Sequence, residues 1–153
     1  MSRIANIADA RILKARGLPL DLPIEEATFS LEYSRHWFRL MEAHSTFMNA
    51  INEYAAGPRA GSPGKWKLAK RRLAGLDGAM GECLCFASKL GGGSDPPVFE
   101  SEQDRHEHDL LLFFLLKRAA PFVQFWSRAI EAADAGAELL IRPSDVPLWF
   151  DKD

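Results

Sequence analysis

Two long segments of this chain repeat apolar residues at alternating spacings of three and four, and this rhythm constrains the fold more than any other feature. In the segment 23–56 the repeat consists of Trp37, Leu40, His44, Phe47, Ile51 and Tyr54. In the segment 65–90 it consists of Trp66, Ala69, Leu73, Leu76, Met80, Cys83, Ala87 and Leu90. Residues at these spacings form a continuous stripe along one face of an α-helix. Because a short connection joins the two predicted helices, we expect them to form an antiparallel hairpin.

Clusters of proline and glycine divide the rest of the chain into further helical segments. These clusters lie at 17–23, 57–64 and 91–97. Each one combines a helix stop with residues that suit the first turn of a new helix. The patterns between them predict three more helices, at 2–16, 98–119 and 122–134. Pro121 separates the last two, because proline lacks the backbone N–H that a helix interior requires.

The C-terminal tail, 141–153, contains two prolines and is expected to be extended. Its apolar cluster of Leu148, Trp149 and Phe150 needs cover, either from its own bundle or at an interface with a second copy or a partner. No segment shows the strict alternation of a strand followed by a hairpin turn. We therefore expect a single all-α domain over 1–153, a compact bundle of four to five helices with helical hairpins and an extended C-terminal tail.

Three glycines lie inside the predicted helix 65–90, at Gly75, Gly78 and Gly81. Each glycine in a helix interior costs about 1 kcal/mol relative to alanine. A compensating interaction is therefore expected. We predict that another helix of the bundle packs closely over this small-residue face.

Composition narrows the class of protein. The chain has 153 residues, of which 47% are hydrophobic and 26% charged, with a net charge of -2. This balance favours a soluble globular domain and shows no overall basic excess for nucleic acid. The longest unbroken apolar run, Leu110–Leu116, is too short to span a bilayer, and 1–16 lacks the apolar block of a secretory signal. Two cysteines form no disulfide framework. We expect a cytoplasmic protein without a membrane segment.

Histidines and carboxylates gather at 100–109, just before the long apolar run. His106 and His108 point about 200° apart on a helix and cannot hold one ion together. A metal would need ligands from another helix, so a metal site is the less favoured interpretation. Carboxylates are stabilised at the start of a helix by its dipole. The segment therefore indicates a solvated helix N-terminus, and no metal or other cofactor is expected.

Arg39 and His44 are separated by four residues. This Arg-x-x-x-x-His spacing resembles the motif of HEPN-type ribonucleases, which are themselves all-α bundles. The resemblance rests on these two residues and implies that they act on RNA. The alternative is that His44, which lies in the apolar stripe, is a core histidine hydrogen-bonded to a neighbour. We favour the alternative and assign no catalytic residue.

A run of cations occupies the first turns of the predicted helix 65–90, where the helix dipole disfavours positive charge. We predict a partner-binding site made of Lys65, Trp66, Lys67, Lys70, Arg71 and Arg72. Trp66 would be its apolar anchor, because tryptophan is enriched in binding hot spots. If the hairpins are antiparallel, Lys117 and Arg118 lie beside this run and reinforce a basic pole. An acidic protein surface is the favoured partner, and nucleic acid is the alternative.

These observations favour a small non-enzymatic regulatory, inhibitor or adaptor protein that acts by binding another protein. Bacterial and phage-encoded anti-activators and inhibitors belong to this class. The first alternative is a nucleic-acid-binding protein or HEPN-like ribonuclease, and the second is a metal-dependent helical bundle. Assembly into a homo-oligomer is left open.

Overall fold

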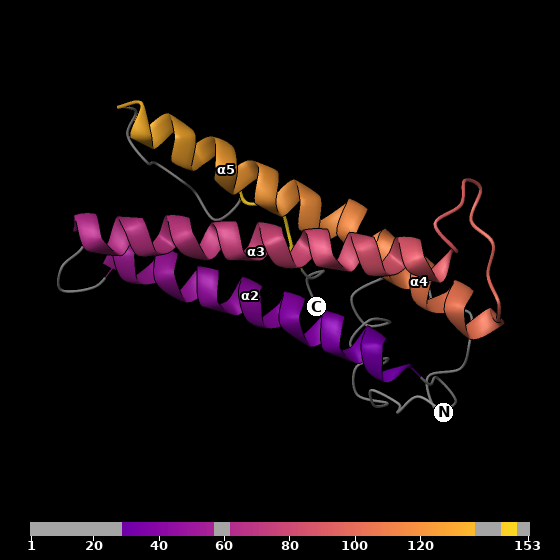
Figure 1. Cartoon of the computed structure of the whole chain (residues 1–153). Helices are drawn as coiled ribbons and strands as arrows, with labels where there is room; N and C mark the ends of the chain where they lie inside the picture. Colours follow the sequence, from indigo (N-terminus) through magenta and orange to yellow (C-terminus); the bar gives the residue numbers. More distant parts are fainter. Residues whose placement is uncertain (1–28, 57–61, 137–144, 150–153) are drawn as a thin grey trace.

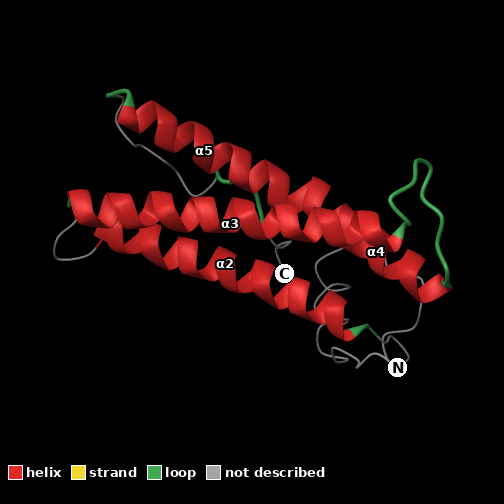
Figure 2. Ribbon diagram, viewed as in Figure 1, coloured by secondary structure: helices red, strands yellow, loops and turns green. Residues whose placement is uncertain are grey.

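The computed structural model describes residues 29–56, 62–136 and 145–149. Helices account for 81% of these residues, and none of them lies in a strand. The elements are α2 (Leu31–Ala56), α3 (Pro63–Leu90), α4 (Glu102–Phe114), the π-helical segment η2 (Leu115–Ala119) and α5 (Ala120–Asp134). The last three follow one another without a break, so the described part of the chain contains three long helices (Figures 1 and 2). The predicted all-α class is confirmed. The bundle of four to five helices is not, and 2–16 lies outside the described residues.

Helices α2 and α3 form the expected antiparallel hairpin. Near the start of α2, the ring of His36 stacks on Phe86 near the end of α3, with 4.6 Å between ring centroids. At the other end of the pair, Tyr54 contacts Trp66 at 4.9 Å. Ser62 begins α3 by accepting a hydrogen bond from the Lys65 backbone N–H, and Pro63 occupies its first turn. The boundaries predicted for this helix were therefore within two residues of those observed.

The third long helix runs through Pro121, where the sequence predicted a kink or an end. Proline there has no N–H, and its ring crowds the carbonyl four residues earlier. The chain accommodates both effects by widening into the π-helical turn of η2. Its closing bond runs from the Ala120 N–H to the carbonyl of Leu115, five residues back. Helix α4, η2 and α5 therefore form one continuous helical segment of 33 residues, Glu102–Asp134, which we call the rod.

Large aromatic side chains fill the space between α2 and this rod. Trp37 contacts Phe114 edge-on at 5.0 Å, and Phe47 contacts Trp126 in the same way at 5.3 Å. Helix α3 packs against both α2 and the rod (Figure 1). Its inner face contributes Ala69, Leu73, Leu76, Cys83, Phe86 and Ala87 to the core. No described helix covers the outer face of α3.

A buried carboxylate joins the start of α4 to the start of α2. Glu107 accepts hydrogen bonds from the backbone N–H and the hydroxyl of Ser30, the latter at 2.9 Å, and from the Gln103 amide at 3.2 Å. The Ser30 hydroxyl in turn accepts from the Tyr33 N–H and caps α2. Burial raises the pKa of Glu107, and the bonds from Ser30 and Gln103 oppose that rise. This contact joins the residue before α2 to the first turns of α4.

By length and composition alone, the rod Glu102–Asp134 would be apolar enough to cross a membrane. The same test is passed by the core helix of a soluble protein. Leu110, Leu111, Phe114, Phe122 and Trp126 of this rod are buried in the domain core. The unbroken apolar run Leu110–Leu116 alone does not reveal the apolar character of the whole rod, because polar residues interrupt the rod on both sides of that run.

Candidate protein-binding surface on helix α3

The basic run at the start of α3 divides into two groups in the structure. Three of its side chains bind to the chain itself. The Lys65 ammonium donates to the carbonyl of Glu53 at 3.4 Å. The Trp66 indole N–H donates to Asp134 at 2.8 Å, and Lys70 donates to the other oxygen of the same carboxylate at 3.1 Å. Lys65, Trp66 and Lys70 are therefore engaged rather than free to meet a partner.

Asp134 faces the basic run because the rod continues past Pro121 to its full length. The start of α3 then lies beside the end of α5, and not beside Lys117 and Arg118 as predicted. Those two cations sit in the middle of the rod. The hydrogen bonds from Trp66 and Lys70 lower the pKa of Asp134. The expected reinforcement of the basic pole is thus wrong, and a carboxylate partly neutralises the run.

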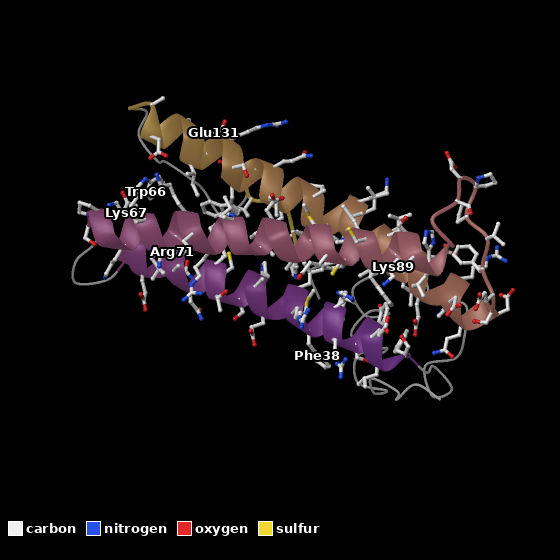
Figure 3. All side chains as sticks on the ribbon, in the orientation of Figure 1. Phe38, Trp66, Lys67, Arg71, Lys89 and Glu131 are labelled. Carbon is white, nitrogen blue, oxygen red and sulfur yellow. The ribbon has the colours of Figure 1, made fainter. Side chains whose placement is uncertain are left out.

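The remaining three cations, Lys67, Arg71 and Arg72, are exposed. Figure 3 shows Lys67 and Arg71 along α3, with Trp66 beside Lys67. Among the residues that the structure describes, no carboxylate forms an ion pair with any of the three. We call these three residues the basic strip. They are the part of the predicted site that remains available for binding.

The glycines of α3 lie next to the basic strip, and no helix of the described chain covers them. Gly75, Gly78 and Gly81 are exposed. A methyl group added at any of them would meet no described atom within 4 Å beyond its own helix backbone. None of the described helices makes the predicted close packing over this face, because α2 and the rod both pack on the opposite side of α3. Together with Arg71, Ala74, Glu82 and Cys85, the glycines form what we call the α3 outer face.

The C-terminal tail places Trp149 in the core instead of at an interface. Its side chain is 4% exposed and contacts Phe114 and Phe122 edge-on at 5.1 and 5.3 Å. The indole N–H points to the sulfur of Met41 at 3.4 Å. Leu148 is 43% exposed, and Phe150 lies outside the described residues. Of the predicted interface cluster, only Leu148 is seen at the surface.

His44 lies between the rings of Trp149 and Phe122, at centroid distances of 4.2 and 4.9 Å. Burial lowers its pKa to about 4. The predicted hydrogen bond to a neighbour is not formed with any described residue, and ring stacking takes its place. Arg39 is exposed and points about 140° away around the helix. The two residues of the HEPN-like spacing therefore do not meet.

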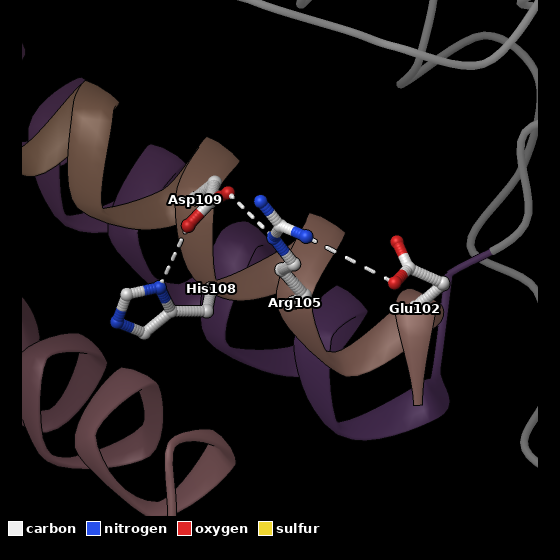
Figure 4. Close-up of polar contacts among 4 residues, drawn as sticks. All are labelled: Glu102, Arg105, His108 and Asp109. Carbon is white, nitrogen blue, oxygen red and sulfur yellow. Dashed lines mark hydrogen bonds and ion pairs between the residues drawn. The ribbon is translucent and has the colours of Figure 1, made fainter. Parts of the chain in front are cut away.

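Charged side chains at the start of α4 pair with one another (Figure 4). Arg105 lies 3.9 Å from Glu102 and 4.0 Å from Asp109, and Asp109 also contacts His108 at 3.0 Å. Ser101 caps the helix through the Asp104 N–H. Within 29–56, 62–136 and 145–149, no group of three or more side chains is arranged to hold a metal ion. Glu102, Arg105 and Asp109 are exposed, as expected for a solvated helix N-terminus, whereas Glu107 of the same segment is buried.

Sequence reasoning missed two features of this surface. It did not anticipate Asp134 as the counter-charge of the basic run, since that required the rod to continue through Pro121. It also assigned the glycines to the interior, although their spacing of three is compatible with either side of a helix. No protein-family model matches the chain, and no curated protein or solved structure is similar enough to count as a match.

Proposed function

We propose that this chain is a non-enzymatic regulatory or adaptor protein that binds an acidic surface of a partner protein through the basic strip. One observation carries the proposal. Three cations, Lys67, Arg71 and Arg72, stand exposed on a rigid helix without a described counter-charge, while neighbouring Lys70 is paired. Like charges placed together destabilise the isolated chain, and a partner carboxylate removes that repulsion.

A rigid strip of cations acts mainly on the rate at which a partner is found. Complementary charge steers the encounter, and the effect declines as salt screens it. The chain has a net charge of only -2, so the steering depends on this local cluster rather than on the whole molecule. Binding should therefore weaken as ionic strength rises.

The test compares two double charge reversals in capture experiments with extract from the native host. In the first variant, Lys67→Glu and Arg72→Glu alter the basic strip, and Arg71 is kept because it also borders the glycines. In the matched control, Lys117→Glu and Arg128→Glu make the same charge change at exposed positions of the rod. We expect a protein retained by the wild type and the control, released by salt, and lost from the first variant.

Equal retention by all three proteins would contradict the proposal. So would a tight, salt-sensitive gel shift of RNA or DNA by the wild type, which would assign the strip to a nucleic-acid backbone. Circular dichroism spectra and melting points of both variants should match the wild type, because neither pair of side chains packs in the core.

A further inference from the structure

Within the described part of the chain, no contact accounts for glycine at Gly75 and Gly78 of α3. Both have ordinary helical backbone angles, and both are exposed. Each costs about 1 kcal/mol relative to alanine when it lies in an exposed helix interior. The advantage that glycine does offer is close approach of another backbone, which needs a surface without side chains. The α3 outer face offers such a surface at its glycines, and no described element packs on it.

Two opposite charges flank these glycines symmetrically. Arg71 and Glu82 are eleven residues apart, which is about three helical turns, so their side chains project from the same face. Both are exposed, and neither forms an ion pair within the described part of the chain. The midpoint between Arg71 and Glu82 falls between Leu76 and Asp77. That point is also the midpoint between Gly75 and Gly78.

From this coincidence we propose that the α3 outer face packs antiparallel against the same face of a second copy of the chain. A two-fold axis through the shared midpoint sets Gly75 of one copy against Gly78 of the other. The same axis sets Arg71 of each copy against Glu82 of the other, which forms two ion pairs. An isologous interface requires this kind of self-complementarity. The proposal does not rest on the partner-binding function, although Arg71 is common to the two surfaces.

A second copy fits this face better than an unrelated acidic helix does, because the face carries both signs of charge in matching places. Helices that cross through small residues diverge on either side, at angles near 50° in the commonest class. Lys67 and Lys89 lie well away from the axis. The divergence of the two helices therefore keeps these lysines apart from the lysines of the other copy. Lys67 and Arg72 stay accessible in the dimer, so the basic strip retains two of its cations for a partner.

A single pair of crossing helices buries less surface than the roughly 1,600 Å² of a standard stable interface. The dimer should therefore be weak and form in a concentration-dependent way. Sedimentation equilibrium of the full chain measures this directly. We expect a mass of 17.1 kDa at low concentration and approach to twice that value in the upper micromolar to millimolar range.

Charge-reversal variants test the ion pairs between Arg71 of one copy and Glu82 of the other. Arg71→Glu alone and Glu82→Arg alone should each raise the dimer dissociation constant about tenfold, because two attractions become two repulsions. The two substitutions together should restore a dissociation constant close to the wild-type one. Gly78→Leu should abolish the dimer and leave the melting point unchanged or raised, because no described atom of the same chain lies within 4 Å of the added Cβ. Glu131→Arg, an exposed reversal on α5 shown in Figure 3, should have no effect.

A monomer throughout the concentration series would overturn the proposal and leave the face to a different protein. Failure of the double reversal to restore the dimer would overturn the pairing of Arg71 with Glu82 and the two-fold axis with it. Lys67→Glu with Arg72→Glu should leave the dimer intact. This variant therefore separates a loss of partner binding by the basic strip from a loss of the dimer.

Discussion

At the scale of single residues, His44 shows how a titratable side chain can be held in an aromatic core. The imidazole is stacked on Trp149 and contacts Phe122, and its ring has no hydrogen-bond partner among the described residues. Such an environment favours the neutral form, since the charged ring would lose hydration without a counter-charge. The stripe of apolar residues placed His44 in the core from sequence. The stacking partner, more than a hundred residues away in the tail, could not be read from that local pattern.

The depressed pKa of His44 predicts a pH dependence of stability. The unfolded chain binds a proton below the ordinary value of 6.5, whereas the folded chain resists it until about pH 4. The free energy of unfolding should therefore fall as pH is lowered from 6.5 towards 4, by about 2 kcal/mol from this residue. Urea unfolding at pH 7 and pH 5 should show a smaller loss for His44→Phe than for the wild type.

Glu107 acts in the opposite direction, because its raised pKa makes protonation favour the folded state as pH falls. This contribution is present in both the wild type and His44→Phe. The difference between the two proteins isolates His44. Equal losses for the two proteins would show that the imidazole protonates within the fold.

At the scale of elements, local patterns determine α2 and α3 well, and they do so for physical reasons. A long apolar stripe with a serine cap and a terminal glycine is a local signal, and Ser62 and Gly91 bound α3 where that signal predicts. The end of the helix at Pro121 was predicted wrongly, because the helical backbone continues through it. Proline interrupts an ideal helix, but burial of Phe114, Leu115, Phe122 and Trp126 along one rod favours continuity, and the π-helical turn relieves the clash. The local sequence does not show whether tertiary packing will keep a helix continuous through a proline.

The open glycines give a test at this scale. Gly78→Ala should raise the free energy of unfolding of the dilute monomer by about 1 kcal/mol, because the new methyl group meets no described atom and the helical backbone is better populated. Gly92→Ala is the contrasting variant. Its backbone φ of 73° disfavours any side chain, so it should destabilise the chain. Chemical denaturation of both variants at low concentration checks the signs. Destabilisation by Gly78→Ala would mean that another part of the chain covers α3.

At the scale of the whole molecule, the length of the rod determines how much of the basic run remains available. Because Glu102–Asp134 is continuous, its last residue reaches the start of α3 and engages Trp66 and Lys70. The sequence identified the cations of the candidate site but not their counter-charge, since the two are 64 to 68 residues apart. The result is a surface in which the outer cations are open and the inner ones are satisfied.

Removal of this counter-charge should strengthen the electrostatic steering that we propose. Asp134→Asn keeps a hydrogen-bond acceptor for the Trp66 indole but leaves Lys70 without its ion pair, so a fourth cation joins the basic strip. With the partner captured by the wild type, the association rate should rise several-fold at low salt and converge with the wild-type rate at high salt. Glu131→Gln, which removes a charge from the same helix without touching α3, is the matched control. Equal association rates for both variants would indicate that net charge, and not the cluster at the start of α3, guides the encounter.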